Sequence, residues 1–537
     1  MARQFSHRRL AGGAGIAAIL VAAGVLVALV SGDLRAGSRL LQATGNAPSP
    51  AATPRTSAAD PSGPPVRITV TGKLTGQTIR PGFLGLSFEF PAVRAYTGSD
   101  AARINPVLVA LIRNLTPDQR PVIRIGGDST DLSYVPAPGV RPPRYVGYQL
   151  TPSWMATTSA LAHQLDARMI MGLNLVANEP ALAAAEAGDF VRYLGPGSID
   201  ALEIGNEPNV YGKLTKVPTA QGASVKARRR GYGYPAYRRQ FAAVAAASPR
   251  LPLAGPALTT GPNPGRGSWI DTIPDFLKSQ RVAIMTVHRY PLRNCYVPPS
   301  SPQYPTVANL LSDYSTTGLA ASLRGWIRLA HAQHRPLRLD ELNSVACRGK
   351  AGVSDTFASS LWVLDALFAL ARAGVDGVNI HTLPATAYEP FAFSDSGGRW
   401  SAQVRPLYYG LEMFAQAAPP GARLLKLEGP GPGTGLSAWA TRGPGGERRV
   451  VLINKSETQA RTVTLALAHG PGARAAVERL QAPSVYSRTG VTLGAGSYGT
   501  RTYTGQLPAP RTQSVAPSDR GYTISVPRGS AALVSLR

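Results

Sequence analysis

Two glutamates each end a short apolar run and then meet a polar turn. They are Glu207, within LEIGNEPN at 202–209, and Glu341, within LRLDELNS at 337–344. Each run is typical of a buried strand, and a carboxylate at such a strand end is expected to face a cleft. Two such carboxylates fit glycoside hydrolysis, in which one protonates the leaving oxygen and the other attacks the sugar. The Asn-Glu-Pro triplet is fairly specific, whereas a lone strand-end glutamate is more often a salt-bridge partner.

The elements that must position this pair recur along the chain. Several apolar runs are separated by amphipathic or alanine-rich stretches such as 156–165, 319–333 and 355–373. Strands that alternate with helices predict a parallel sheet. Eight of them between residues 81 and 420 predict an α/β fold, a (β/α)8 TIM barrel, with its chemistry where the strands end. The predicted strands are 83–90, 122–126, 169–176, 201–205, 251–257, 282–287, 337–339 and 375–380.

Other polar residues follow the same predicted strands. Each one alone is more often structural than catalytic, but their convergence on one rim predicts a site there. Arg124 is expected to be the partner of a carboxylate. The other candidates at strand ends are Glu89, Asp128, Asn174, Asn206, His288, Tyr290 and His381.

The pattern of residues changes in the last part of the chain. After an expected helix at 406–417, residues 421–537 form short alternating runs separated by Gly and Pro. This pattern predicts a C-terminal antiparallel β-sandwich domain. No catalytic cluster is visible in it, so a packing or accessory role is expected.

The N-terminal residues predict export. A basic opening precedes residues 10–30, which carry no charge and are long enough to cross a bilayer. The exit, Val30-Ser31-Gly32-Asp33, is a poor cleavage site, which favours an uncleaved signal anchor in 1–37 over a cleaved signal peptide. Either way the bulk of the chain is expected outside the cytoplasm, anchored to the membrane or, after cleavage, secreted. Residues 38–65, rich in Ala, Pro, Ser and Thr, are expected to be a flexible linker.

Only two cysteines occur, Cys295 and Cys347. In an exported protein such a pair predicts a disulfide, which here would tie two strand-end loops together beside Glu341. Two free buried thiols are the alternative.

The formal charge of +26 comes from 56 Lys and Arg against 30 Asp and Glu. Such a field favours anionic partners and, in an exported sugar hydrolase, an acidic glycan. The alternative is an arginine-rich composition with a solvated surface. No nucleic-acid-binding module is recognisable.

Several stretches together resemble glycoside hydrolase family 79, the family of β-glucuronidases and heparanase. The resemblance extends over nearly everything from about residue 66 onward and implies that strand 66–70, within an N-terminal segment 66–80, joins the C-terminal β-domain. The matching stretches are RIGGDS at 124–129, EIGNEPN at 203–209, HRYP at 288–291, ELNS at 341–344, GVSDTFA at 352–358, VLINK at 451–455 and PRGSAAL at 527–533.

The resemblance implies that Glu207 is the acid/base and Glu341 the nucleophile. An ionised Glu341 needs donors nearby, such as Asn206, Tyr290 or Arg124, and its charge would raise the pKa of Glu207. Asn206 is expected to bond the sugar 2-hydroxyl, and Tyr290 to orient Glu341.

One departure from the family concerns the loop after Glu341. In family glucuronidases this loop helps to hold the uronate carboxylate, but here residues 345–350, VACRGK, lack the expected aromatic residue. Arg348 and Lys350 are candidate cationic clamps instead. The basic and aromatic loop 226–234 is either a subsite for an acidic glycan or a solvated loop.

The sequence therefore predicts a retaining glycosidase, β-glucuronidase-like, that binds a carbohydrate, with an acidic glycan as one candidate. A barrel hydrolase on a neutral β-glucoside or β-xyloside and a noncatalytic glycan-binding surface protein are the alternatives. No cofactor and no metal site are expected, because the histidines do not cluster with carboxylates at ligand spacing and the mechanism needs no metal.

Overall fold

The computed structural model describes residues 62–143, 145–213, 215–218, 224–263, 268–430, 434–468, 470 and 472–536. The predicted membrane segment and most of the predicted linker lie outside these ranges. Among the helices within them, none is both long enough and apolar enough to span a bilayer.

Eight parallel strands close into a barrel, as predicted, and every predicted strand run overlaps one of them. Each strand is almost wholly buried, which explains why the runs read as continuously apolar rather than alternating. In chain order the strands are β2 (Leu84–Phe88), β3 (Val122–Ile125), β6 (Arg168–Leu173), β7 (Ile199–Ile204), β10 (Leu253–Thr259), β11 (Val282–His288), β13 (Leu337–Leu342) and β15 (Gly377–Thr382).

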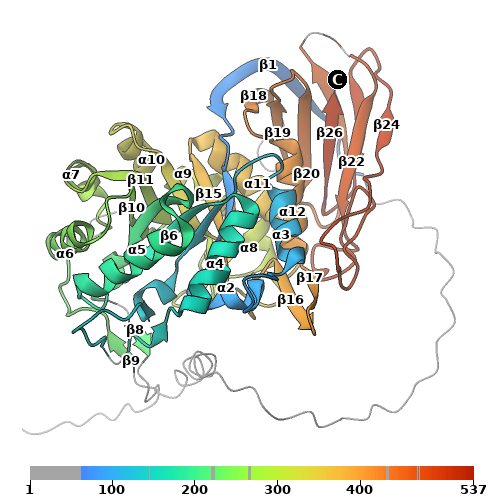
Figure 1. The fold of residues 1–537 in the computed structure, drawn as a ribbon. Coiled ribbons are helices and arrows are strands. Elements are labelled where there is room, and N and C mark those ends of the chain that lie inside the picture. Colours follow the sequence, from blue (N-terminus) through green and yellow to red (C-terminus); the bar gives the residue numbers. More distant parts are fainter. Residues whose placement is uncertain are drawn as a thin grey trace, which may run out of the picture.

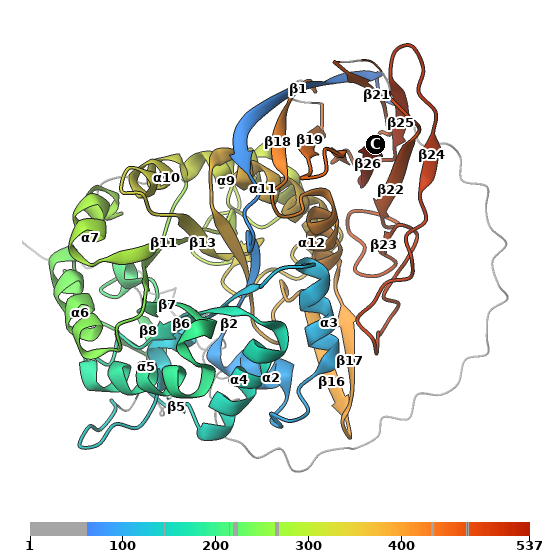
Figure 2. The same cartoon turned by 45° about the horizontal axis from the view of Figure 1, so that its top comes forward.

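Helices cover the outside of the barrel (Figures 1 and 2). Most of the longer ones have proline in the first turn, where its fixed φ suits the helix and its missing N–H costs nothing. The predicted stretch 319–333 is two helices rather than one. The helices are α2 (Phe90–Thr97), α3 (Pro106–Leu115), α4 (Pro152–Leu165), α5 (Pro180–Leu194), α6 (Tyr234–Ala247), α7 (Ile273–Ser279), α8 (Val307–Leu311), α9 (Thr317–Ser322), α10 (Arg324–His331), α11 (Ala358–Ala373) and α12 (Pro406–Ala417).

Short 3-10 helices and short strand pairs lie in the loops that follow the barrel strands. The 3-10 helices there are η1 (Asp128–Leu132), η3 (Pro208–Val210), η4 (Ile270–Thr272) and η5 (Asp313–Ser315), and η2 (Pro196–Ser198) precedes β7. The short strands pair as β4 (Ser133–Tyr134) with β5 (Tyr148–Gln149), β8 (Thr215–Pro218) with β9 (Ser224–Lys226), β12 (Leu292–Arg293) with β14 (Val345–Ala346), and β16 (Phe391–Ser396) with β17 (Arg399–Val404).

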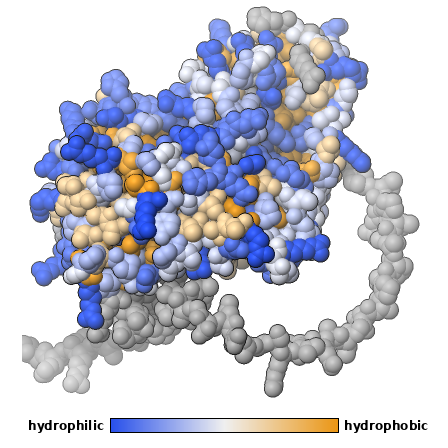
Figure 3. Space-filling view, in the orientation of Figure 1, coloured by the Kyte–Doolittle hydropathy of each residue, from blue (hydrophilic) through white to orange (hydrophobic). Residues whose placement is uncertain are grey.

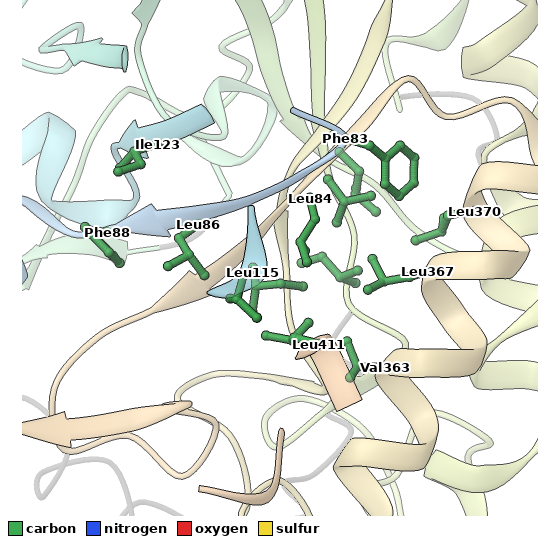
Figure 4. Close-up of a cluster of buried hydrophobic side chains, with 14 of the residues drawn as sticks. Phe83, Leu84, Leu86, Phe88, Leu115, Ile123, Val363, Leu367, Leu370 and Leu411 are labelled. Atoms are coloured by element: carbon green, nitrogen blue, oxygen red, sulfur yellow. The ribbon is translucent and has the colours of Figure 1, made fainter. Parts of the chain in front are cut away.

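The main core lies between the barrel wall and helices α3, α11 and α12 (Figure 4). Side chains of and next to β2, such as Leu84 and Leu86, face Leu367 of α11 and Leu411 of α12 there. Residues 358–371 of α11 are all buried. A helix that is buried all round must have partners on every side, and α11 lies between the barrel and the C-terminal domain.

The C-terminal strands form a separate, largely antiparallel domain around a second apolar core, as predicted. Strand β1 (Val66–Thr78) completes this β-domain by pairing antiparallel with β18 and parallel with β21. The strand order is β23-β22-β26-β20-β19-β18-β1-β21-β25, and β24 pairs with β22. Their bounds are β18 (Arg423–Glu428), β19 (Leu436–Arg442), β20 (Arg448–Asn454), β21 (Arg461–Leu467), β22 (Ala475–Gln481), β23 (Thr492–Leu493), β24 (Gln513–Val515), β25 (Tyr522–Val526) and β26 (Ser530–Leu536).

A buried polar contact joins the two domains at Asp365 of α11, which is 1 % exposed. Its carboxylate accepts hydrogen bonds from Trp439 Nε1 at 2.7 Å and Ser437 Oγ at 2.9 Å. Lys455 Nζ lies 3.0 Å from the same carboxylate and 3.2 Å from exposed Asp313. The barrel therefore supplies the anion, and the β-domain supplies every donor.

The face of the molecule drawn in Figure 3 is mostly hydrophilic, with apolar residues in small groups between the polar ones. The net charge of +26 gathers anions near such a surface.

We expect Asp365→Ala to lower the free energy of unfolding by about 3–5 kcal/mol, because it leaves a buried ammonium without its main partner. Asp313→Ala is the matched control, since it removes the exposed partner of the same lysine and is expected to cost less than about 1 kcal/mol. Denaturant titration followed by tryptophan fluorescence measures both. Equal losses in the two variants would contradict the assignment of Asp365 as the interdomain anchor.

Candidate active site

Glu207 lies just beyond β7 in a strained turn. Its backbone is left-handed, with φ 52° and ψ 50°, and Gly205 two residues earlier has φ 80°. Non-glycine residues rarely adopt this conformation, and it is concentrated at functional sites. The Glu207 N–H donates to the carbonyl of Ala257 at 2.9 Å, and the side chain is 14 % exposed. The turn thus directs a partly accessible carboxylate over the end of the barrel.

Glu341 reaches the same place because β13 carries a β-bulge. Val287 pairs with Leu339, but the next residue of β11, His288, pairs with Glu341, so Asp340 is an extra residue. Successive side chains of a regular strand point to opposite faces, whereas a bulge re-aims them. Both Asp340 and Glu341 consequently face Arg124 inside the barrel.

Arg124 of β3 is completely buried and occupies the centre of the site. Each nitrogen of its guanidinium has at least one partner, and the partners come from strands β2, β7, β11 and β13 or the residues just after them. Nε donates to Glu203 at 2.6 Å, Nη1 to Glu341 at 2.9 Å and to Ser87 at 3.2 Å, and Nη2 to Asn206 at 3.0 Å with His288 Nε2 at 3.3 Å. The expectation that Arg124 partners a carboxylate is confirmed.

Glu341 is held in its ionised form. Burial alone would raise the pKa of its carboxyl, but His381, His288 and Arg124 together outweigh burial and leave the pKa well below its usual range. Tyr290 donates its hydroxyl to Oε1 at 3.0 Å. The carboxylate is therefore charged, oriented and 10 % exposed, which are the properties of a nucleophile.

His288 lies between the two glutamates. Its Nδ1 is 3.3 Å from Glu207 and 3.6 Å from Glu341, and one oxygen of each glutamate and one ring nitrogen all lie within 4.8 Å of one another. Because Arg124 can only donate to Nε2, the neutral imidazole carries its proton on Nδ1, toward the glutamates.

The sequence expectation that histidines do not cluster with carboxylates is wrong, because two such groups form in the fold. His288 lies with Glu207 and Glu341, and also with Glu203 and Asp340. Strands distant in sequence bring these residues together, so linear spacing could not show it. The guanidinium of Arg124, within 3.3 Å of Glu203, Asp340 and His288, occupies the place a cation would take in the second group.

Glu89 and His381 border the site from β2 and β15. The Glu89 carboxylate accepts the N–H groups of Asp128 at 3.1 Å and Ser129 at 2.8 Å, at the start of η1. Gly127 has φ 93°, and a side chain there would collide with this carboxylate. His381 Nε2 is 3.4 Å from Glu89, and burial is outweighed by Glu341 and Glu89, which raise the pKa of His381.

Asn206 and Asp128 lie at the rim, as the sequence analysis expected. Asn206 Nδ2 donates to Asp128 at 3.3 Å, while its carbonyl is held by Arg124. The Asn206 backbone N–H donates to Asp131, a buried carboxyl that also takes the Tyr211 hydroxyl. Burial raises the pKa of Asp131 to about 6, with Tyr211 opposing it. Asn206 is thus fixed at both backbone and side chain.

Asn174 has a structural role, because its hydrogen bonds are made within the fold and not toward the cleft. Its side-chain amide donates to the carbonyl of Ser133 at 2.7 Å and accepts the N–H of Ala177 at 2.8 Å, and its own N–H donates to Glu186. The residue is 1 % exposed. These bonds shape the loop after β6 and leave no free polar atom directed at the glutamates.

Arg348 and Lys350 lie on the exposed loop after β14. The predicted disulfide between Cys295 and Cys347 is confirmed, with 6.2 Å between the Cα atoms. It reinforces the pairing of β12 with β14 and the 3.1 Å bond from Asn294 Nδ2 to the Gly349 carbonyl. The loop that carries Arg348 is therefore tied to the loop after β11.

Tyr388, in the loop after β15, is a site residue that the sequence did not predict. Its ring lies 6.5 Å from that of Tyr290 and 6.2 Å from that of His381. Burial, Glu341 and Glu89 raise its pKa, and the charge of Arg348 opposes them. Among the described residues its hydroxyl has no hydrogen-bond partner. An aromatic residue therefore does stand beside Glu341, but from the next loop. No local pattern in the sequence distinguishes it from the chain's other tyrosines.

The basic loop after β7 is more structural than its composition indicated. Arg228 donates to the carbonyls of Leu175 at 2.6 Å and Val176 at 2.8 Å, and it lies over the rings of Tyr211 and Tyr232. Its charge is used to hold two loops together.

Comparisons with known proteins agree with this architecture. Residues 438–533 match the model of the glycosyl hydrolase family 79 C-terminal beta domain. A 4-O-alpha-L-rhamnosyl-beta-D-glucuronidase from Fusarium oxysporum 12S has a similar structure, with a TM-score of 0.64 and 22 % identity over 89 % of this chain and 99 % of that one.

Two further solved structures share the fold at lower identity. A GH51 arabinofuranosidase from Xanthomonas axonopodis pv. citri has a TM-score of 0.61 and 14 % identity over 88 % of this chain and 100 % of that one. A GH family 44 xyloglucanase from Paenibacillus polymyxa has a TM-score of 0.56 and 11 % identity over 88 % of this chain and 99 % of that one. The search of curated proteins found no match.

The family 79 resemblance that the barrel motifs predicted is thus confirmed in the β-domain. Residues 438–533 thus match the family 79 C-terminal beta domain, and they are joined to a closed barrel that has glutamates at the ends of its fourth and seventh strands.

Proposed function

We propose that the protein is a retaining β-glycosidase, β-glucuronidase-like, in which Glu341 is the nucleophile and Glu207 the acid/base. The observation that carries the proposal is the contrast between the two carboxylates. Glu341 is enclosed by Arg124, Tyr290 and two histidines, whereas the Glu207 carboxylate, 14 % exposed, has the ring of His288 beside it.

The nucleophile's environment supports covalent catalysis. Arg124 and Tyr290 each bond one oxygen of Glu341 and so fix the plane of the carboxylate. Attack on the sugar transfers an electron pair from one of these oxygens to the anomeric carbon, while the bond to the leaving oxygen breaks. Water then cleaves the glycosyl-enzyme ester and releases Glu341.

The separation of the pair supports retention. An oxygen of Glu207 and an oxygen of Glu341 lie within 4.8 Å of each other. Retaining enzymes hold their carboxyl groups about 5–5.5 Å apart, and inverting enzymes leave about 6.5–9.5 Å for a water molecule. Glu207 gives its proton to the leaving oxygen and afterwards takes one from the attacking water.

The groups around the pair suit a pyranose ring. Asn206, fixed by Arg124 and Asp131, presents its amide nitrogen near Asp128 and is the candidate donor to the sugar 2-hydroxyl, a contact that strengthens in the transition state. Glu89 and Asp128 supply acceptors for other hydroxyls. Both are anchored at the start of η1.

A uronate carboxylate would meet positive charge at the rim. Arg348 is exposed, its charge acts on Tyr388, and its carbonyl accepts the N–H of Ala387 at 3.1 Å. Tyr388 adds an unbonded hydroxyl. A guanidinium beside a phenol provides donors matched to a carboxylate, and we propose these residues, with Lys350 near them in sequence, as the acidic-sugar contact.

We also propose that the catalytic part works outside the cytoplasm. The uncharged segment at 10–30 and the disulfide between Cys295 and Cys347 support export. The segment 10–30 then serves as a membrane anchor or, if cleaved, as a signal peptide.

A panel of aryl β-glycosides tests the function directly. We expect turnover of the glucuronide, with the glucoside and the xyloside at least about tenfold lower in kcat/KM, since a lost charge-assisted contact costs at least that much. Proton NMR of the first-formed product is expected to show the β-anomer. Preference for a neutral sugar would replace the uronate assignment, and no turnover at all would favour a noncatalytic glycan-binding protein.

The roles of the two glutamates are separable with leaving groups. Glu341→Ala is expected to abolish turnover of every substrate. Glu207→Ala is expected to keep measurable activity on aryl glycosides with very acidic phenols, because these leave without a proton, and to lose activity on alkyl glycosides. Steady-state kinetics on matched substrates measures this difference. Equal losses on both substrate types would rule out Glu207 as the acid.

Charge selection is tested by replacing both Arg348 and Lys350 with Ala. A charge-assisted hydrogen bond contributes roughly 1.5–3 kcal/mol, so kcat/KM for the aryl glucuronide is expected to fall by about ten- to a hundredfold. The matching glucoside is expected to change little. Arg520→Ala, at an exposed position of the β-domain, is the control. An equal fall on both sugars would mean that the loop acts only through its structure.

A further inference from the structure

Asp340 is a buried acid that the mechanism above does not use. It directly precedes Glu341, is 0 % exposed, and faces Arg124 inside the barrel together with Glu341. Neither of its oxygens accepts a hydrogen bond from any described residue, and Oε1 of Glu203 also has none. Buried acceptors without donors are costly, so these orphan oxygens require an explanation.

The charges around Arg124 do not balance if every carboxyl is ionised. Glu203, Asp340 and Glu341 all lie within 3.3 Å of this one guanidinium. Even with His381, whose pKa is raised, 3.8 Å from Glu341, three carboxylates beside one arginine would leave uncompensated negative charge in a dry space. When acidic groups share a buried site, the usual solution is that one of them keeps its proton.

The distances select which carboxyl keeps the proton. Glu203 receives a 2.6 Å bond from Arg124 Nε, and Glu341 receives a 2.9 Å bond from Nη1. Asp340 is farther away, at 3.3 Å from Nε, and is 3.6 Å from His288 Nε2. Since Nε2 is the acceptor of Arg124, His288 has no proton to offer on that side.

We propose that Asp340 is protonated in the working enzyme and shares that proton with Glu203, which makes it a positioning residue for the nucleophile. The inference rests on the proposed function only where the nucleophile is concerned. The Asp340 hydroxyl donates to the orphan oxygen of Glu203. The single negative charge shared by Glu203 and Asp340 then balances Arg124 at Nε. The N–H groups on Nη1 and Nη2 are left to hold Glu341 and Asn206.

The directions of the pKa shifts agree with this assignment. Burial and the neighbouring Glu203 charge raise the pKa of Asp340 well above its usual range, with Arg124 opposing them. Burial also acts to raise the pKa of Glu203, but Arg124 and the bond to Asp340 outweigh it and lower that pKa. Arg338, two residues earlier on β13, donates to Asn379 and to the Gly82 carbonyl and so points away from Asp340.

Infrared difference spectroscopy of the full chain tests the proton without any need for turnover. At neutral pH the wild type minus Asp340→Asn is expected to contain the carbonyl stretch of a buried carboxylic acid. The subtraction matters because other buried acids, such as Glu186, also have raised pKa values. Absence of this band from the difference spectrum would overturn the proposal.

The sharing is tested by Glu203→Gln, compared with the double variant Glu203→Gln, Asp340→Asn. Without Glu203 the only carboxyl left beside Arg124 Nε is Asp340, so it is expected to ionise and its acid band to vanish from this second difference. If the band persists, burial alone protonates Asp340 and the sharing is refuted.

The kinetic test uses Asp340→Asn, because an amide mimics the protonated acid in shape and in its ability to donate. It is expected to keep kcat/KM within about threefold, with the acid limb of the pH profile in place. A loss greater than about tenfold with a displaced acid limb would mean that ionised Asp340 is required. Exposed Asp313→Asn is the matched control. Failure of the glycosidase proposal would remove this readout but not the infrared result.

Discussion

The site depends on one buried cation. Arg124 has no exposed surface, and its guanidinium joins residues of four other barrel strands or the turns after them. A buried ion pair of this kind adds little to stability compared with apolar packing, but removal of one partner is expensive. Its value here is geometric: Glu341, Asn206 and His288 all take their positions from the same planar group. The direction of each N–H is fixed by the resonance of the guanidinium.

Negative side chains lie close to this centre, and positive side chains lie mainly on the outer surface. Carboxyl groups gather inside the barrel mouth, on Glu89, Glu203, Glu207, Asp340 and Glu341, although the chain as a whole carries a formal charge of +26. The excess arginine lies mainly on the surface, and some of it, such as Arg228, is already used to join loops. An anionic sugar would therefore be drawn by the outer field and then meet an acidic interior. Arg348 is an exposed cation at this rim.

The second domain contributes to the site through support rather than chemistry. Helix α11 follows the loop after Glu341, is buried on all sides, and meets the β-domain through Asp365. The N-H groups of Phe357 and Ala358, at its start, donate to carbonyls of the β-domain, those of Ser487 and Val485. Strand β1, from the start of the described chain, completes the same domain. The loop between Glu341 and α11 is thus held at one end by β13 and at the other by the β-domain.

The sequence by itself determined the fold and the two glutamates. Eight buried parallel strands give apolar runs that can be counted. Asn206-Glu207-Pro208 at a strand end predicts a candidate catalytic glutamate in the turn. Arg124, Glu89, His288 and Tyr290 followed because parallel strands that end on one face bring their last residues together. The cysteine pair followed from composition and predicted export.

Only the tertiary structure decided what each of these residues contacts. A strict alternation along β13 would place Asp340 and Glu341 on opposite faces, and the bulge that places both inside depends on the neighbouring strands. Asn174 and Arg228 have the right types for a site but are used by backbone carbonyls of adjoining loops. Tyr388 has no motif around it and joins the site through the position of the loop after β15. Linear spacing records the direction of a strand, whereas contacts between strands, bulges and loop packing are set by residues far away in the chain.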